Sequence, residues 1–382
     1  MDNSKSILLI SWSLPPIKGP RSIKSEAILK GFYEKFEHIT LVTRDLSSNY
    51  VKEKFPNASF IPMASKEIAS LDIDVKKSEK LGLHWLKRMV NGLLTKFCNY
   101  PDIMVFFRLV KAFRRLRSQN FDYALSIDGP QTMHWAVAYL RWRNKLNVKV
   151  WIADNGDPLT RNLPGNMVAP YFKYIEDWFC EKTDILTVPV YEGYGYFKTR
   201  FRKKIQIVKH SLIFPSKKEF SPTGEISSTN MIHMAYAGNM MPYQAKAKLF
   251  FKQIGEMDLS FTLHIYGSNG SLVRGLVAEY PMLKEKVIDH GLLEREKLLL
   301  ELQEMHFLVY FPYNDTGQVP FKLIDYAFTG LPVLRYDLET KESLKSFLDG
   351  DYTEKEALPN YQDYHYADTT AEYVNLFERF EQ

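Results

Sequence analysis

Short apolar runs alternate with helix-like patterns along almost the whole chain, and this alternation limits the fold more than any other feature of the sequence. The runs occupy residues 7–11, 39–43, 60–62, 121–127, 148–153, 185–190 and 205–209, and then 232–237, 261–266, 287–292, 307–311 and 331–334. Apolar runs of this length, with amphipathic helices between them, are typical of parallel strands buried on both faces of a sheet. The polar segment 214–230 separates the two groups and is the predicted linker. The sequence therefore predicts an α/β protein with two Rossmann-like doubly wound domains, residues 1–213 and 214–366.

The composition agrees with a globular protein of two domains, because 45% of the 382 residues are hydrophobic and 25% are charged. Cys98 and Cys180 lack the spacing of a metal site, and we interpret them as core thiols in a reducing compartment. No apolar stretch approaches the ~18 residues of a spanning helix. The first apolar run is too short for a signal peptide. We therefore expect a cytoplasmic protein.

A basic region lies between residues 76 and 117, although the net charge of the whole chain is only +5. Apolar side chains such as Trp85, Leu93 and Phe97 are interleaved with its lysines and arginines. This pattern is typical of a basic amphipathic helix on an anionic membrane, which would make the protein peripheral to the inner face of the cell membrane. A solvated helix with its apolar stripe against the core would give the same pattern. Because no nucleic-acid motif accompanies the charge, we expect no nucleic-acid partner.

The segment 317–336 carries the most specific chemistry. Pro320 opens a helical pattern that ends at Gly330, and Pro332 prevents its continuation. Lys322 and Asp325 lie near the start of this helix. A cation and a carboxylate at the positive end of a helix suit a phosphate and a ribose hydroxyl. The alternative is a solvated Lys–Asp pair one turn apart.

This segment resembles a signature of the GT-B glycosyltransferases, in particular of the GT4-like group (glycosyltransferase family 4). The matching residues are Lys322, Asp325, Tyr326, Gly330 and Pro332, against the pattern Lys-x-x-Glu-Tyr…Gly-x-Pro. The resemblance implies that Lys322 meets the donor diphosphate and that Asp325 bonds the ribose. Asp325 is one methylene shorter than the usual Glu. Gly317 stands where many retaining members carry a second Glu, so that role is vacant or filled by another group.

The first domain resembles the same group in two loops. The segment Pro15-Pro16…Gly19-Pro20 is similar to the loop that opens the acceptor-side domain, which implies that Gly19 approaches the donor phosphates and that Arg21 supplies charge. The block from Asp128 to His134 is similar to a stretch that lines the cleft, which implies that His134 touches the transferred sugar. The alternatives are an ordinary strand-to-helix loop and a structural histidine.

A third match runs from Asp154 to Asp157, where the group commonly reads Asp-x-Arg-Asp-Pro and this chain has Gly156 in place of Arg. Asp154 and Asp157 are candidates for an acceptor base or for orienting loops. The alternative is a turn capped by Asp157 before Pro158. Together with His134 and Lys322, Asp157 completes the predicted catalytic set.

The remaining predicted donor contacts lie at strand ends of the second domain. Gly238 and Asn239 follow one strand, and a glycine there allows close approach to phosphate or sugar. The resemblance implies that Gly291 lies beside the nucleotide base. The loop before the helix that Pro320 opens is placed to contact the sugar through Thr316, Gly317 and Gln318. The resemblance further implies that the final helix, residues 367–382, packs back onto the first domain.

These observations predict a glycosyltransferase, specifically a hexosyltransferase, that moves a sugar from a nucleotide diphosphate to an acceptor hydroxyl. If the likeness holds, the reaction retains the anomeric configuration and serves surface polysaccharide or other glycan synthesis. We expect a UDP-sugar as donor substrate, a glycan or lipid-linked acceptor, and no cofactor, since no Walker loop is present. The alternatives are a sugar-nucleotide epimerase of the same shape, an inactive nucleotide-sugar-binding protein, and a structural scaffold.

Overall fold

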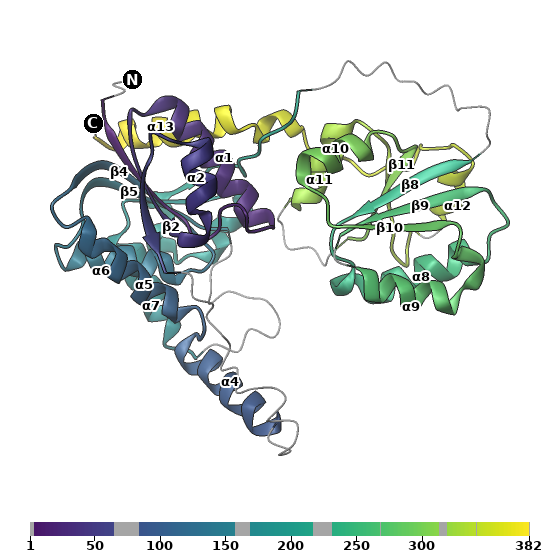
Figure 1. The fold of residues 1–382 in the computed structure, drawn as a ribbon, viewed down its shortest axis with the longest axis horizontal. Coiled ribbons are helices and arrows are strands. Elements are labelled where there is room, and N and C mark those ends of the chain that lie inside the picture. The colour runs from purple at the N-terminus through teal and green to yellow at the C-terminus, as the bar shows by residue number, and fades with distance from the viewer. Residues whose placement is uncertain are drawn as a thin grey trace. The chain divides into compact units, whose positions relative to one another are not determined.

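The computed structural model describes residues 4–64, 84–156, 169–216, 231–267, 269–312, 319–340 and 342–381. The chain divides into two compact units. Unit 1 comprises Met1–Ile213 with Tyr364–Gln382, and unit 2 comprises Phe214–Asp363. Each unit is an α/β structure of its own, coloured in chain order in Figure 1.

Unit 1 is built on a sheet of seven strands in the order β3-β2-β1-β4-β5-β6-β7, and neighbouring strands pair in parallel. The strands are β1 (Ser6–Ile10), β2 (His38–Arg44), β3 (Ser59–Met63), β4 (Asn120–Ile127), β5 (Asn147–Asp154), β6 (Ile185–Val188) and β7 (Ile205–Ile207). The five inner strands are mostly buried, as continuous apolar runs require when helices cover both faces of a sheet, whereas the edge strands β3 and β7 are only partly buried.

Helices cover both faces of this sheet. The helices are α1 (Pro20–Lys35), α2 (Ser48–Lys54), α4 (His84–Cys98), α5 (Ile103–Ala112), α6 (Thr132–Trp142), α7 (Phe172–Lys182) and α13 (Tyr366–Glu381). One hydrophobic core joins α1, α2 and α13 to the sheet, and the other joins α5, α6 and α7. The C-terminal helix α13 belongs to the first of these, where Tyr373 packs on Phe32 and Phe377 stacks on Tyr123.

Unit 2 repeats the plan with five parallel strands in the order β10-β9-β8-β11-β12. The strands are β8 (Ile232–Ala237), β9 (Phe261–Tyr266), β10 (Val287–Gly291), β11 (Phe307–Tyr310) and β12 (Val333–Arg335). Its helices are α8 (Gln244–Gly255), α9 (Gly270–Glu279), α10 (Arg295–Leu302), α11 (Phe321–Thr329) and α12 (Ser343–Leu348). Cores on the two faces contain α8, α9 and α12 on one side and α10 and α11 on the other. The strand order reverses between β8 and β11, and ligands bind at such a point in open α/β sheets.

Local differences from the sequence prediction have physical causes. The apolar pattern that follows the run 185–190 predicts a helix over residues 193–201, and this prediction is wrong. Two 3-10 segments, Tyr191–Tyr196 and Thr199–Lys204, take its place. Gly193 and Gly195 each weaken an α-helix by about 1 kcal/mol relative to alanine, which outweighs the short apolar pattern. By contrast, α11 ends as predicted, at Gly330 with φ of 75°. Cys180 is buried as predicted, but Cys98, the last residue of α4, is exposed, so the prediction of a core thiol is wrong for Cys98. Among the described helices, none is long and apolar enough to cross a membrane.

Candidate functional site

Three neighbouring strands of unit 2 end in glycines, which leaves bare backbone at the carboxyl edge of the sheet. Gly238, Gly267 and Gly291 follow or close β8, β9 and β10 and have φ of 118°, 143° and 67°. Gly238 N–H donates to Tyr266 O over 2.8 Å, and Gly267 N–H donates to Gly291 O over 2.7 Å. A Cβ on Gly267 would lie 2.4 Å from Gly238 O, so this position requires glycine. The predicted positions Gly238 and Gly291 thus lie at one edge.

An asparagine that the sequence analysis missed holds this edge together. The buried Asn269 donates from Nδ2 to Gly238 O over 2.7 Å and accepts from Met240 N–H over 2.7 Å. The predicted contact Asn239 is exposed, and its Oδ1 accepts only from the nearby Met241 N–H. Because Asn239 directly follows Gly238, its backbone nitrogen lies at the same edge of the sheet. The signal for Asn269 was its position two residues after a glycine that ends a strand.

Lys322 lies in the first turn of α11 and is surrounded by tyrosines. Its Nζ donates to Tyr236 Oη over 3.0 Å. The same ammonium lies 4.6 Å, 5.0 Å and 5.9 Å from the ring centroids of Tyr236, Tyr243 and Tyr310. It also lies beside Gly238, since a Cβ on that glycine would be 3.3 Å from Nζ. The lysine therefore faces the reversal point between β8 and β11.

Burial lowers the pKa of Lys322 to about 8, because a desolvated ammonium is less stable than a hydrated one. Among the described residues, no carboxylate forms an ion pair with it. Cation–π contacts and one neutral hydroxyl compensate a buried charge only in part. An anion at this site would supply the missing charge, and a diphosphate does so with several oxygens.

This arrangement predicts a pH dependence for binding of a nucleotide sugar, whose diphosphate does not titrate near neutrality. Anion binding raises the pKa of Lys322, so affinity is greatest below pH 8, where the lysine is already protonated in the free protein. Above pH 8 affinity falls by up to about tenfold per pH unit. Calorimetry at pH 8.5 in two buffers of different ionisation enthalpy should show proton uptake on binding. An affinity independent of pH up to 9 would contradict this assignment.

Asp325, the predicted ribose contact, is engaged by an arginine. Arg295 on α10 bonds both carboxylate oxygens, with Nη2 to Oδ1 at 2.5 Å and Nε to Oδ2 at 3.4 Å. The Arg295 guanidinium also lies 5.1 Å from the Phe214 ring centroid. Burial raises the pKa of Asp325, and the Arg295 charge opposes that rise. The carboxylate therefore has a partner in place, and Arg295, which the sequence analysis missed, is a second polar group beside the predicted ribose contact.

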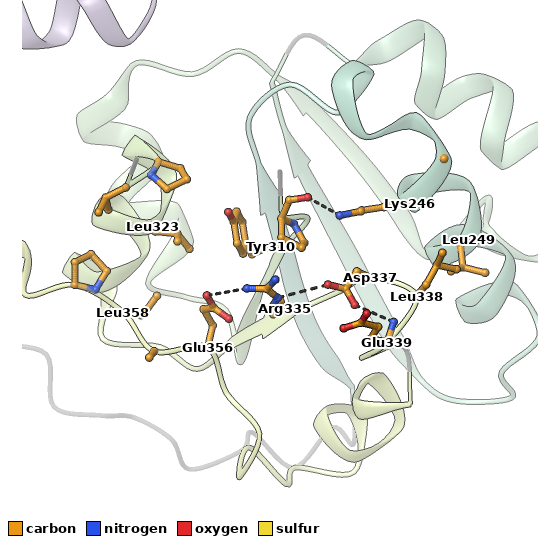
Figure 2. Close-up of a pocket in the computed structure, with 16 residues that line it drawn as sticks. Lys246, Leu249, Tyr310, Leu323, Arg335, Asp337, Leu338, Glu339, Glu356 and Leu358 are labelled. Carbon is orange, nitrogen blue, oxygen red and sulfur yellow. Dashed lines mark hydrogen bonds and ion pairs between the residues drawn. The ribbon is translucent and has the colours of Figure 1, made fainter. Parts of the chain in front are cut away.

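A cavity of about 1060 Å³ adjoins this site at the carboxyl ends of β11 and β12. Figure 2 shows Arg335 between Asp337 and Glu356. Its Nε lies 3.5 Å from Asp337 Oδ2, and its Nη1 lies 3.7 Å from Glu356 Oε1. Lys246, on the opposite wall, donates to Pro312 O over 2.5 Å. Leucines of α8 and α11 and prolines 312, 320 and 359 complete the lining. Tyr310 belongs both to this wall and to the ring set around Lys322, so the two features are contiguous.

The corresponding edge of unit 1 carries Gly19 and Arg21. Gly19 precedes α1, with φ of 139° and no side-chain cap. The exposed Arg21 lies over Gly129, where a Cβ would approach its Cδ to 2.4 Å. Gly129 is therefore the residue that lets Arg21 lie across the β4 loop. Arg21 also lowers the pKa of Asp102 against the larger effect of burial, which raises it.

His134 departs from its predicted role. It is fully buried, its Nδ1 lies 2.8 Å from Ser126 Oγ, and its Nε2 lies 3.2 Å from Asp154 O. Its ring stacks on Phe179. Burial lowers its pKa to about 4, so the ring is neutral at physiological pH. In this structure His134 contacts Ser126, Asp154 and Phe179 inside unit 1, as the structural alternative expects.

Asp154 is likewise internal and does not offer a base to an acceptor. Its carboxylate lies 2.5 Å from Lys24 Nζ and accepts from Thr187 Oγ1 and Tyr373 Oη, both at 3.0 Å. Burial would raise the pKa of Asp154, but Lys24 and the two hydroxyls hold it below its usual value. At the position where the group has arginine, Gly156 instead donates its N–H to Asp128 Oδ2 over 2.8 Å.

No family model matches the sequence, and no curated protein matches it. Solved structures do match over the whole chain. An α,α-trehalose-phosphate synthase (UDP-forming) from Burkholderia xenovorans has a TM-score of 0.65 and 10% identity, covering 98% of this chain and 100% of its own. Anabaena HepE, solved with UDP and glucose, has a TM-score of 0.63 and 10% identity, covering 98% of this chain and 100% of its own. The lipopolysaccharide outer core galactosyltransferase WaaB has a TM-score of 0.58 and 12% identity, covering 98% of this chain and 99% of its own. The chain has the GT-B fold.

Four predicted residues of this GT-B chain, Asp157, Thr316, Gly317 and Gln318, lie outside the described residues. In unit 2 the structure brings together Gly238, Asn239 and Lys322, with Gly291 and Asp325 at the same edge. In unit 1 it brings together Gly19, Arg21 and the Gly129 loop, and it removes His134 to the interior.

Proposed function

We propose that this protein is a glycosyltransferase that takes a sugar from a nucleotide diphosphate and transfers it to an acceptor hydroxyl. One observation carries the proposal: Lys322 is a desolvated cation at the strand-order reversal of unit 2, beside a bare glycine and without an ionic partner among the described residues. A diphosphate leaving group gains negative charge as the glycosidic bond breaks. A cation already held in a water-poor site stabilises that charge without having to reorganise.

The cavity beside Tyr310 suits the uncharged sugar. Its wall carries three carboxylates, Asp337, Glu339 and Glu356, against two cations, Arg335 and Lys246. Carboxylates repel a diphosphate but accept hydrogen bonds from sugar hydroxyls. The division of charge between the cavity and Lys322 therefore favours a ligand with an anionic part and a neutral polyhydroxy part.

The likeness in fold adds support for the donor class. WaaB is a galactosyltransferase, HepE was solved with UDP and glucose, and the trehalose-phosphate synthase is UDP-forming. We therefore propose a UDP-hexose donor. Retention of configuration, a role in surface glycan synthesis and membership of the GT4-like group are part of the same proposal, supported by the Lys322–Pro332 signature. Metal independence remains a prediction.

A sugar-nucleotide epimerase is the second candidate, because a putative UDP-N-acetylglucosamine 2-epimerase from Listeria monocytogenes also matches the fold, at a TM-score of 0.52 and 13% identity. The two activities differ in what leaves the protein. A transferase releases nucleoside diphosphate in proportion to acceptor, whereas an epimerase returns an intact nucleotide sugar. Chromatography of the nucleotide products, with and without acceptor, therefore decides between them.

We further propose that α4 contacts an anionic membrane surface. Five apolar side chains are exposed on this helix, Trp85, Met89, Val90, Leu93 and Phe97. Trp85 is 65% exposed, which is unusual for an indole in a protein of this size. The exposed Arg114 and Arg115 follow α5 and supply positive charge. The part of the basic region before residue 84 lies outside the described residues.

Substitution on this surface should release the protein from vesicles that contain anionic lipid. We expect Leu93→Ser with Phe97→Ser to weaken vesicle binding at least tenfold, because each loses about 1.5–3 kcal/mol of apolar burial in the membrane. Arg114→Ser with Arg115→Ser should weaken binding to anionic vesicles only. Sedimentation with neutral and anionic vesicles measures both effects, and Tyr174→Ser, also exposed but outside α4, is the control. Unchanged sedimentation of both double variants would refute membrane contact.

A further inference from the structure

Two arginines of unit 1 lie against one tryptophan at the carboxyl edge of the sheet. The Arg44 guanidinium lies 4.8 Å from the Trp12 ring centroid, and the Arg108 guanidinium lies 5.9 Å from it. Arg44 also donates from Nε to Trp12 O over 3.1 Å. Because the indole and this hydrogen bond fix its position, Arg44 is presented in a defined orientation.

The arrangement brings like charges together. Burial lowers the pKa of Arg44, the Arg108 charge lowers it further, and Asp45 partly opposes both. Among the described residues, no carboxylate forms an ion pair with Arg44. Both arginines are only partly exposed, so water screens their repulsion incompletely. A pair of half-buried guanidinium groups with this geometry matches an anion of two or more oxygens.

The pair occupies the edge where ligands of α/β sheets bind. Trp12 follows β1, Arg44 is the last residue of β2, and Arg108 reaches the edge from α5. The strand-order reversal of this sheet lies between β1 and β4, next to this loop. The arginine pair thus belongs to unit 1, whereas Lys322 belongs to unit 2.

Exposed apolar side chains lie on α5, which carries Arg108, and on the preceding helix α4. Met104 precedes Arg108 by one helical turn on α5 and is 37% exposed, and the neighbouring Phe107 is 57% exposed. The turn at residues 99–102 joins α5 directly to α4, where Ile103 N–H donates to Asn99 O. The exposed Phe97 and Leu93 continue the apolar surface on α4. A ligand that places an anionic group on the arginines therefore has the exposed Met104 side chain, on the same face of α5 as Arg108, next to it.

We propose that Arg44 and Arg108, held against Trp12, bind the phosphate or diphosphate group of the acceptor, so that the acceptor is a phosphate ester. That the bound phosphate ester acts as acceptor rests on the proposed glycosyltransferase function. Phosphate binding by the two arginines does not depend on that function. The phosphate comes from one of two sources, a water-soluble sugar phosphate or a lipid-linked phosphate.

The test uses the full-length chain with Lys322→Met, so that diphosphate binding in unit 2 does not contribute. Calorimetry with inorganic diphosphate and with geranyl diphosphate should show binding, weakened at least tenfold by Arg44→Gln and by Arg108→Gln. Arg117→Gln, an exposed arginine of the same basic region, should leave both affinities within twofold. Absence of binding at millimolar concentration, or unchanged affinity in both glutamine variants, would overturn the proposal.

The two probes distinguish the sources of the phosphate. Tighter binding of geranyl diphosphate, with the advantage lost in Phe107→Ser, identifies a lipid phosphate, and equal affinities identify a water-soluble one. If a glutamine variant does not fold by circular dichroism, Arg44→Lys replaces it. Lysine keeps the charge but not the planar fork, so we expect a several-fold loss, and an unchanged affinity would count against the pair. UDP binding by the arginine variants with Lys322 intact should equal wild type, which separates failure here from failure of the proposed function.

Discussion

Replacing Lys322 by methionine should reduce nucleotide-sugar affinity and turnover by a factor of at least about 100, the loss typical when one preorganised charge at a leaving group is removed. The side chain length is nearly kept, so the change removes the ammonium and its bond to Tyr236 without opening a large void. Because the ammonium is desolvated in the free protein, its removal should not lower the unfolding temperature of unit 2. Loss of binding together with unchanged or increased stability is the signature of a residue retained for its ligand.

The matched control is Lys252→Met on α8. This lysine is exposed, and its Nζ lies 3.9 Å from Glu256 Oε1 in a surface ion pair. Its substitution should therefore leave binding and stability unchanged. Titration of both variants with a UDP-sugar, alongside thermal unfolding, measures the two quantities. Wild-type affinity in Lys322→Met would remove the central residue from the account.

Asp154→Ala should destabilise unit 1 by about 3–5 kcal/mol, because it leaves the Lys24 ammonium buried without its anion. The substitution also removes the acceptor for Thr187 Oγ1 and Tyr373 Oη, so it loosens α13 from the sheet. Urea unfolding followed by fluorescence measures the change in the free energy of unfolding.

Two further variants separate the cause. Lys24→Met with Asp154→Asn removes both charges and keeps the hydroxyl contacts, and it should recover most of the lost stability. Glu181→Gln, in an exposed pair with Arg200 at 2.8 Å, should cost less than about 1 kcal/mol. A loss for Asp154→Ala no larger than for Glu181→Gln would show that the buried pair is not a structural requirement.

Much of the fold could be predicted from local sequence. The apolar runs give the strands, because a parallel sheet covered on both faces needs no alternation. Gly330 and Pro332 predict the end of α11, and the position of Lys322 in its first turn follows from Pro320. The prediction of a helix at residues 193–201 was wrong because two glycines destabilise an α-helix there by more than its short apolar pattern stabilises it.

The environment of each side chain could not be predicted in the same way. The tyrosines around Lys322 come from three segments that only the tertiary fold brings together. Arg295 and Asp325 are 30 residues apart. The resemblance that located His134 at a loop could not show that its ring turns inward onto Ser126 and Phe179. Position along the chain identified candidate residues, and packing determined which of them are buried in the core and which lie at the edge of a sheet.

The most direct test of the account is to incubate the wild-type protein with UDP-glucose, UDP-galactose, UDP-N-acetylglucosamine and GDP-mannose, with and without phosphate-ester acceptors, and to separate the nucleotides by chromatography. We expect that one sugar nucleotide, a UDP-hexose, yields nucleoside diphosphate, that acceptor increases the yield, and that Lys322→Met abolishes it. Conversion of a sugar nucleotide to its epimer without acceptor dependence, or the absence of any product or binding across the set, would contradict it.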